Sequence, residues 1–215
     1  MSSGHQAPDG GQKSDPLLIV ISAPSGGGKT TLCEQLLAQQ PGIVRAVTCT
    51  TRPPRPGERD GVDYYFLDPL TFQERARAGE FLEHATVHGN HYGNAKAEVL
   101  GKLRQGRDVL LNIDVQGAAT IREKAARDPE LSHALLSVFL TPPSLAVLEA
   151  RLRKRAADPE DVVRARLGAA RQEIAQWRQF DYLIISTSIA EDLRRMQVIL
   201  EAERMRQRRA RPPEI

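Results

Sequence analysis

The residues with the clearest chemistry form a glycine-rich run that ends in a lysine and two threonines. This run, Ala23-Pro-Ser-Gly-Gly-Gly-Lys-Thr-Thr31, has the spacing G-x-x-x-x-G-K-[ST], with Ala23 in place of the first glycine. An apolar, strand-like segment precedes it and a helical pattern follows it, which is the context that a phosphate-binding loop requires. The residues expected to bind a nucleoside triphosphate are Ala23, Pro24, Ser25, Gly26, Gly27, Gly28, Lys29, Thr30 and Thr31.

Each residue type in this loop has a physical reason to be there. Gly26, Gly27 and Gly28 are expected to adopt positive φ and to bring N–H groups close to phosphate oxygens. The N-terminus of the following helix adds free amides and the positive end of its dipole. Lys29 supplies a mobile charge for the β and γ phosphates, and the Thr30 hydroxyl can ligate Mg²⁺. An ordinary glycine turn before a helix would not explain a lysine and a threonine in this register.

A second cluster of side chains suited to anions lies between residues 48 and 64. The segment reads Thr48-Cys-Thr-Thr-Arg-Pro-Pro-Arg-Pro-Gly-Glu-Arg-Asp-Gly-Val-Asp-Tyr64. Prolines beside Arg52 and Arg55 limit the loop entropy that is lost on binding. Two guanidinium forks and one phenol are suited to a phosphate dianion. On residue types alone, an exposed basic turn is the alternative.

The elements that must position these loops follow from an alternation of short apolar runs with longer amphipathic stretches. Nearly continuous apolar runs are typical of strands that are covered on both faces. Strands are expected at 17–21, 42–47 (the weakest), 109–113, 135–140 and 182–185. Helices are expected at roughly 28–40, 117–128, 143–155, 159–178 and 189–209. The alternation predicts an α/β fold of the P-loop NTPase type, a parallel five-stranded sheet flanked by helices.

Residues 48–94 break this alternation. They combine the proline-rich basic segment with short aromatic and β-branched pieces and a turn at Gly89-Asn90. That composition favours a small mixed or antiparallel insert on the main sheet. The core of the domain is then expected at 17–47 and 95–205.

The two ends of the chain differ in character. Residues 1–16 are rich in Gly, Ser, Gln, Asp and Pro without an apolar core, which predicts a disordered tail and not a signal peptide. Seven arginines occur between Arg194 and Arg211. They favour a solvated, helical C-terminus followed by a basic tail at 206–215, and binding to RNA or a membrane surface is the alternative.

Bulk properties exclude several classes of protein. The 215 residues are enough for one domain with a substantial core. A formal net charge of +3 does not demand a nucleic-acid partner, and no run of apolar residues is long enough to span a membrane. Cys33 and Cys49 lack the spacing of metal ligands and are expected to be free thiols in a reducing cytoplasm.

Several longer motifs, in the same order, resemble those of guanylate kinases. The resemblance begins with Thr-Thr-Arg-x-Pro-Arg-x-Gly-Glu-x-x-Gly-x-Asp-Tyr and continues through Phe81-Leu-Glu-His-Ala85 and Gly89-Asn-His-Tyr-Gly93. It runs on through Ile113-Asp-Val-Gln-Gly117 and Pro142-Pro-Ser-Leu145. With the phosphate loop and the stretch 155–167, it spans roughly residues 17–205. The chain is thereby identified as similar to one guanylate kinase domain, with an acceptor-binding insert at 48–94 and a helical lid at about 141–166.

The resemblance implies a role for each matching residue. Those implied to hold GMP are Thr48, Arg52, Arg55, Tyr64, Glu83, Tyr92, Asn94 and Asp114. Glu83 is implied to accept the guanine N1–H and the exocyclic amine. Its chemistry agrees, because adenine presents an acceptor at that edge and would leave a buried carboxylate unpaired. In the lid, Arg155 and Arg166 have the family's eleven-residue spacing, whereas Arg151, Arg153 and Arg164 are expected to face solvent.

Some positions depart from the family's usual residues. Thr48 replaces Ser and keeps the hydroxyl. Asn94 stands where Ser or Thr is usual, and Asn112 stands at a usually acidic position. Ala156 replaces a common Gly, and Ser186-Thr187 replaces Asn-Asp near the adenine pocket. None of these changes removes a phosphate ligand.

The implied activity is Mg²⁺-dependent transfer of the γ-phosphoryl group of ATP to GMP, and also to dGMP. Lys29, Arg52, Arg55, Arg155 and Arg166 are the implied catalytic residues, with Thr30 as the metal ligand. The alternatives are a non-catalytic guanylate-kinase-like binding module, a P-loop kinase acting on another phosphorylated small molecule, and an RNA-binding protein. No membrane partner is expected, and a monomer and a homo-oligomer both stay open.

Overall fold

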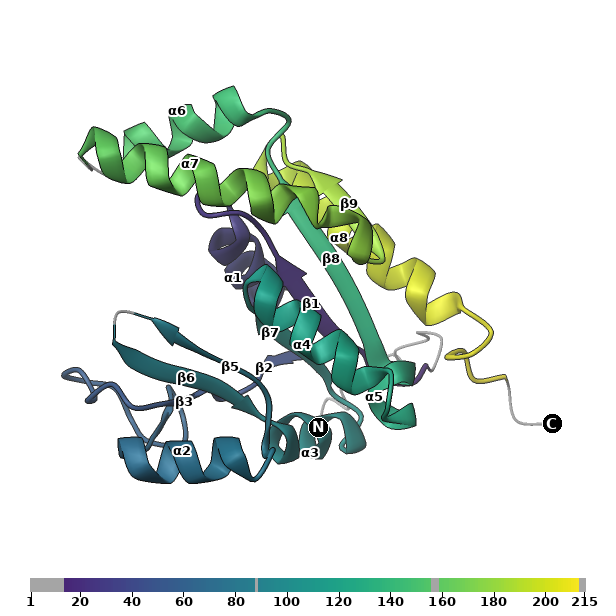
Figure 1. The fold of residues 1–215 in the computed structure, drawn as a ribbon. Coiled ribbons are helices and arrows are strands. Elements are labelled where there is room, and N and C mark those ends of the chain that lie inside the picture. Colours follow the sequence, from purple (N-terminus) through teal and green to yellow (C-terminus); the bar gives the residue numbers. More distant parts are fainter. Residues whose placement is uncertain (1–13, 88, 156–158, 213–215) are drawn as a thin grey trace, which may run out of the picture.

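A computed structural model describes residues 14–87, 89–155 and 159–212, with the main sheet at its centre (Figure 1). The five strands of that sheet are β1 (Leu18–Ser22), β2 (Ile43–Arg45), β7 (Asp108–Asn112), β8 (Leu135–Thr141) and β9 (Tyr182–Ile185). Their order is β2-β7-β1-β8-β9, and every neighbouring pair is parallel. The α/β fold with a five-stranded parallel sheet is confirmed.

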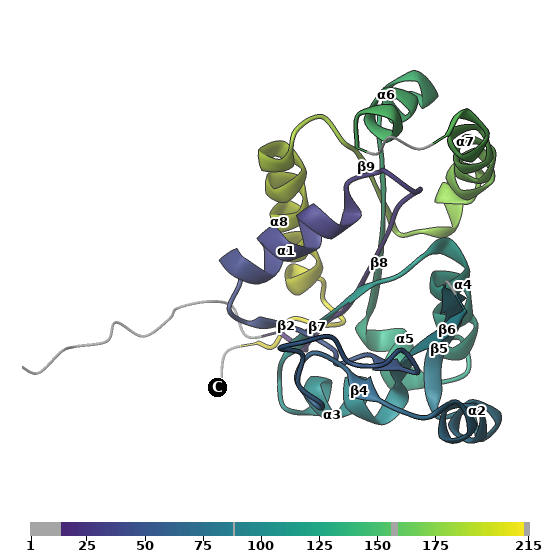
Figure 2. The same cartoon turned by 90° about the vertical axis from the view of Figure 1, so that its left-hand side faces the viewer.

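Helices cover both faces of the sheet because both faces of each inner strand are apolar (Figure 2). Ile19 and Ile21 on one face of β1, with Leu17 just before the strand, pack in one buried cluster with residues of α1 (Lys29–Gln39) and α8 (Ile189–Met205). The other face carries Leu18 and Val20, which pack with α3, α4 and α5. The bounds of these helices are Lys96–Arg104, Val115–Ala125 and Pro129–Ala134. Strand β1 is therefore central within the sheet and is covered by helices on both faces.

The insert forms a separate four-stranded sheet beside the main one (Figure 1). Its strands are β3 (Cys49–Thr50), β4 (Tyr65–Phe66), β5 (Phe81–Val87) and β6 (Asn90–Ala95), in the order β4-β3-β6-β5. β3 and β4 are parallel and the other pairs are antiparallel, so the sheet is mixed. Helix α2 (Pro69–Arg77) packs on it through Phe72, which stacks on Phe81 at 4.6 Å between ring centroids.

Two further helices extend beyond the carboxyl end of β8. They are α6 (Leu145–Arg155) and α7 (Glu160–Ala175), which lie side by side in Figure 1 and share a buried cluster of Leu148, Leu152 and Ala170. The single turn Trp177–Gln179 then leads into β9. This helical pair lies where the sequence predicts a lid.

The prediction of a solvated, helical C-terminus holds for most of its arginines and is wrong for Arg209. Arg209 is 1% exposed, pairs with the equally buried Glu203, and donates to the carbonyls of His133 and Leu135 at 3.2 and 2.9 Å. Arg204 pairs with Asp108 of β7 at 2.7 Å. Arg209 is buried because the chain after α8 turns back along the end of the sheet, a tertiary contact that residue types do not reveal. No helix in the described ranges combines the length and the apolar character needed to cross a membrane.

Candidate active site

The glycine-rich loop lies at the carboxyl end of the central strand and opens directly into α1. Ser22, the last residue of β1, donates from its hydroxyl to the carbonyl of Ile113 at 2.9 Å and so ties the loop's base to β7. The loop encloses a cavity of about 270 Å³, here called the donor cavity. Its lining contains all nine predicted residues, from Ala23 to Thr31, together with Asp114 and Glu173.

Only two of the three loop glycines have positive φ. Gly26 has φ of 81° and Gly28 has φ of 97°, as expected. The prediction is wrong for Gly27, whose role is steric: a Cβ there would lie 2.9 Å from the carbonyl oxygen of Pro24. That carbonyl accepts the Gly27 N–H at 2.8 Å, so the close approach closes the turn. A glycine is needed at position 27 because a side chain would clash with the Pro24 carbonyl. Glycines are needed at positions 26 and 28 because the backbone there has positive φ.

Lys29 begins α1 and reaches across the end of the sheet. Its Nζ donates to the carbonyl of Ile113 at 2.6 Å, and burial lowers the pKa of the ammonium, partly offset by Asp114 and Glu173. Lys29 lines the donor cavity and also a second one of about 310 Å³, here called the acceptor cavity. The lysine therefore lies between two spaces in which phosphates could meet.

The acceptor cavity gathers most of the residues predicted to bind GMP. It is bounded by the insert on one side and by the ends of the main strands on the other. Six of the predicted residues line it, namely Thr48, Tyr64, Glu83, Tyr92, Asn94 and Asp114. The remaining two, Arg52 and Arg55, are not among its lining residues.

Three polar side chains in this cavity form a hydrogen-bonded chain. The Thr48 hydroxyl donates to Oδ1 of Asn94 at 3.1 Å, and Nδ2 of Asn94 donates to Oε1 of Glu83 at 2.6 Å. Glu83 is 6% exposed and Asn94 is 5% exposed. Burial raises the pKa of the Glu83 carboxyl, and the bond from Asn94 opposes that rise. The Asn94 amide thus supports the Glu83 carboxylate by a direct hydrogen bond.

Arg52 and Arg55 lie on the turn at the edge of the insert. Arg52 is held by Glu58 through bonds of 2.8 and 2.9 Å, and its guanidinium lies 5.3 Å from the centroid of the Tyr64 ring. The Glu58 carboxylate raises the pKa of Arg52, and Tyr92 adds a smaller contribution in the same direction. Arg55 is exposed, and its backbone N–H donates to Glu58 at 2.8 Å. The structure thus places Arg52 beside Tyr64 and leaves Arg55 at the surface.

Asp114 has a structural task in addition to its place in both cavities. It caps α4, because its Oδ1 accepts the Gly117 N–H at 2.8 Å. This cap sets the carboxylate at the carboxyl end of β7, beside the Lys29 partner Ile113. Asn112, the last residue of β7, also lines the acceptor cavity.

The lid arginines do not all lie where the sequence predicts. Arg166 is exposed on α7, and Arg155 ends α6 with its side chain outside the described part of the structure. The expectation that Arg151 faces solvent is wrong. Both of its terminal nitrogens lie 3.4 Å from the hydroxyl of Ser186, which itself donates to the buried Asp192 at 2.6 Å. Arg153 is indeed at the surface, paired with Glu149 and Glu160.

Three residues of the site were not predicted. Glu58 orients Arg52, and Arg45 lines the acceptor cavity. Glu173 of α7 accepts the loop N–H of Ser25 at 3.3 Å, and burial raises its pKa. Glu58 could have been found from the sequence, because it follows closely after Arg52 and Arg55. Glu173 could not, because no sequence pattern places it beside Ser25, 148 positions away.

Known proteins resemble this chain over nearly its whole length. The family model described as Guanylate kinase matches residues 15–203. The "Guanylate kinase" of Maricaulis maris is 41% identical, covering 97% of this chain and 93% of its own. That of Bradyrhizobium diazoefficiens is 43% identical, covering 97% and 92%. The crystal structure of guanylate kinase from Anaplasma phagocytophilum is 35% identical with a TM-score of 0.68, covering 93% and 92%.

The fold, the loop and the second cavity agree with these similarities. Most of the motif residues around the two cavities, though not the arginines at 52, 55, 155 and 166, lie at the carboxyl ends of β1 and β7 and on the facing insert. Matches of this extent and identity show common descent over the complete described fold. The chain therefore belongs to the guanylate kinase family.

Proposed function

We propose that this chain transfers the γ-phosphoryl group of ATP to GMP, giving ADP and GDP. The observation that carries this proposal is that Lys29 and Asp114 line both the donor and the acceptor cavity. A phosphoryl group bound in the glycine-rich loop would therefore lie next to the space in which an acceptor phosphate is held. Such a juxtaposition is what transfer between two nucleotides requires.

Selection of guanine falls to the buried carboxylate of Glu83. In its ionised form it accepts two donors, which guanine offers at N1 and at the exocyclic amine. Adenine presents an unprotonated ring nitrogen at that edge, so an AMP complex would leave a desolvated carboxylate against a lone pair. Asn94 donates a hydrogen bond to Glu83, and Thr48 in turn fixes Asn94. The 2′ position of the ribose plays no part in this contact, so dGMP is accepted as well.

The acceptor needs no general base. The second pKa of a phosphate monoester is about 6, so GMP is largely a dianion at neutral pH. Catalysis then consists of holding two anions in line and compensating their repulsion. We assign that compensation to Lys29, Arg52, Arg55, Arg155 and Arg166, with Tyr64 and Tyr92 as hydrogen-bond partners of the acceptor phosphate. Closure of the insert (48–94) and of the lid (about 141–166) would exclude water, a competing acceptor.

Magnesium fits the donor cavity. Mg²⁺ takes few protein ligands and completes its shell with water and phosphate oxygens, so a large cluster of ligands is not required. The Thr30 hydroxyl lies in the donor cavity with the carboxylates of Asp114 and Glu173. No group of three or more metal-ligating side chains occurs in the described ranges, which agrees with a metal that arrives with ATP. Bound there, the ion would neutralise charge on the β and γ phosphates.

The alternatives explain less of the site. A non-catalytic binding module has no use for a lysine that reaches between two cavities. A kinase for another phosphorylated small molecule has no use for the buried chain of Thr48, Asn94 and Glu83. We also propose a cytoplasmic location, because Cys33 and Cys49 are both free thiols.

The test is a coupled assay of ADP release with GMP, dGMP, AMP, CMP and UMP as acceptors. We expect turnover with GMP and dGMP and almost none with the other three. Equal turnover with AMP would refute base reading by Glu83. ADP release that no acceptor stimulates would refute the transfer itself.

Lys29→Ala tests the role of the loop lysine in the transfer. We expect it to reduce phosphoryl transfer by at least a hundredfold, because a preorganised cation at the transferred group is lost. GMP affinity, measured by calorimetry, should stay within about threefold of that of the unmodified protein. Loss of GMP affinity equal to the loss of transfer would indicate a folding defect.

A further inference from the structure

Arg45 has a position that neither the sequence motifs nor the comparisons assign to any task. It is the last residue of β2, the strand that leads into the insert. Its side chain lines the acceptor cavity and also an adjoining cavity of about 300 Å³, here called the flanking cavity. Of the described residues that line these two cavities, Arg45 is the one arginine.

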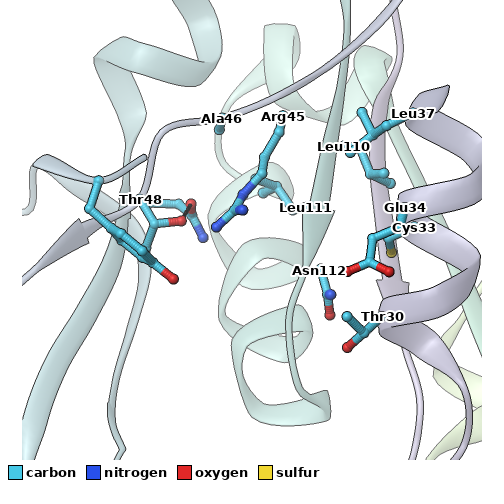
Figure 3. A pocket seen from close by; sticks show the side chains of 12 residues that line it. Thr30, Cys33, Glu34, Leu37, Arg45, Ala46, Thr48, Leu110, Leu111 and Asn112 are labelled. Atoms are coloured by element: carbon cyan, nitrogen blue, oxygen red, sulfur yellow. Dashed lines mark hydrogen bonds between the residues drawn. The ribbon is translucent and has the colours of Figure 1, made fainter. Parts of the chain in front are cut away.

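The close view shows how the side chain lies. In Figure 3, Arg45 extends from the end of β2 into the space between Thr48 on one side and Asn112 and Thr30 on the other. Thr48 and Asn112 belong to both cavities, so the guanidinium lies where the two join. It faces the insert and the ends of the main strands together.

The guanidinium of Arg45 forms no salt bridge with a described carboxylate. Within the described ranges, the structure assigns Arg45 no ion pair, and its specific contact is with the face of Tyr64, 5.7 Å from the ring centroid. Two arginines of the insert do have carboxylate partners, since Arg52 pairs with Glu58 and Arg75 with Glu80. Across the cavities, Asn112 is neutral. Arg45 is therefore an exposed cation that no described carboxylate binds, although Glu34 lines the flanking cavity and Glu83 and Asp114 line the acceptor cavity.

A second cation lies close to the same phenol. The Arg52 guanidinium is 5.3 Å from the centroid of the Tyr64 ring, so two guanidiniums converge on one aromatic side chain. A single carboxylate, Glu58, neutralises Arg52. Two cations beside one phenol repel each other, and an anion bound beside that phenol would offset the repulsion. A phosphate dianion beside the Tyr64 hydroxyl has the charge and the number of acceptor oxygens to do so.

We propose that Arg45 is a third guanidinium that binds the phosphate of the acceptor nucleotide. This inference rests on the proposed function and adds a ligand from β2 to those on the insert. Because β2 belongs to the main sheet, Arg45 holds the acceptor phosphate from the side of the core, whereas Arg52 holds it from the insert. The phosphate thereby joins the two parts of the structure that must approach each other for transfer.

The experiment compares Arg45→Met, which keeps the length of the side chain, with Arg45→Lys, which keeps the charge and loses the fork. Charge-assisted hydrogen bonds predict that Arg45→Met raises the KM for GMP by roughly tenfold to a hundredfold. Arg45→Lys should have an intermediate KM. The inhibition constant of guanosine, which lacks the phosphate, should change by less than about twofold in both variants.

Arg77→Met is the matched control, because Arg77 is an exposed arginine of the insert that lines neither cavity. It should leave both constants unchanged. Weaker binding of guanosine and GMP by the same factor in Arg45→Met would mean a contact with the base or ribose and would overturn the proposal. An unchanged KM for GMP would overturn it as well.

Failure of this inference is distinguishable from failure of the proposed function. The unmodified protein must first show GMP-dependent ADP release that Lys29→Ala removes; without it, the transferase itself is wrong. If the unmodified protein shows this activity, the Arg45 variants alone test whether Arg45 binds the acceptor phosphate. Since Arg45 is exposed and makes no ion pair among the described residues, its variants should unfold at the same temperature as the unmodified protein.

Discussion

The side-chain amide of Asn94 donates a 2.6 Å hydrogen bond to Oε1 of Glu83, with both groups buried. The orientation of the amide is set from its other end, where the Thr48 hydroxyl donates to Oδ1. Because Oδ1 accepts, the nitrogen must face the carboxylate. This arrangement favours the ionised form of Glu83 in a place where burial raises its pKa.

The first prediction concerns Asn94→Leu. Removing the donor should raise the pKa of Glu83 further. As the pH is lowered, guanine binding should therefore weaken at a higher pH in this variant than in the unmodified protein. The measurement is the inhibition constant of guanosine between pH 5 and 8, since the phosphate of GMP itself titrates near pH 6. Asn94→Ser restores a hydroxyl donor and should give an intermediate profile. Identical profiles in all three proteins would show that Asn94 does not act on Glu83.

The same carboxyl has a consequence for stability. Its pKa in the folded state lies above the unfolded value, so ionising it lowers the free energy of unfolding as pH rises through that range. Protonating Glu83 at lower pH therefore restores that part of the free energy of unfolding. Asn94→Leu should make the loss of stability at neutral pH larger.

A second prediction separates the roles of the loop glycines. In Gly27→Ala the new methyl group would lie 2.9 Å from the Pro24 carbonyl oxygen, so the loop must open. The KM for ATP should rise at least tenfold, while guanosine inhibition stays unchanged because the acceptor cavity is intact. Gly42→Ala is the control, with no atom within 4 Å of the new Cβ and no positive φ. Equal effects of the two substitutions would contradict the steric role of Gly27.

The third prediction concerns the buried pair at the C-terminus. Arg209→Met removes a buried partner of the Glu203 carboxylate, which keeps Arg206 at 3.1 Å and the Tyr182 hydroxyl at 2.6 Å, so it should cost roughly 1.5–3 kcal/mol of unfolding free energy. Arg194→Met removes an exposed pair with Glu191 and should lower the free energy of unfolding far less, because water screens that pair. Urea denaturation of both variants makes the comparison. Similar midpoints would mean that the residues after α8 do not support the fold.

A fourth prediction concerns the thiols. Burial raises the pKa of Cys33 to about 12, and burial also raises the pKa of Cys49. Both thiols are therefore protonated and poorly nucleophilic at pH 8. Mass spectrometry after iodoacetamide treatment should find neither alkylated in the native protein and both alkylated in urea. Rapid native labelling of either one would show that its site opens.

Strands were predictable from the sequence where both of their faces are buried. The apolar runs at 17–21 and 182–185 end within one residue of β1 and β9. Helices α2, α3 and α5 were not predicted, because each is short and buries only part of its surface. In α2 only Phe72 is buried, so the helical period is weak despite the Asp68 cap and the proline that follows it.

The site was predictable as far as its residues belong to contiguous motifs. The glycine-rich loop and the residues around Glu83 could be assigned because their spacing carries their chemistry. Arg45 and Glu173 carry no such local signal, since their roles depend on which segments the fold brings together. The same reason explains Arg209: its arginine-rich surroundings indicate solvent, and only tertiary structure supplies Glu203 and the carbonyl oxygens at the end of the sheet.

The central place of β1 in the sheet has a consequence for biosynthesis. Leu18 pairs with Val109 on one side and with Leu135 on the other, so the strand that carries the glycine-rich loop has no neighbours until those segments exist. On the ribosome, the loop near the start of the chain must wait for more than half of the protein to emerge. Pairing of such distant segments is slow. The ability to bind a triphosphate therefore arises late in synthesis. A nascent chain that stalls before β8 has a glycine-rich loop that cannot yet bind a nucleotide.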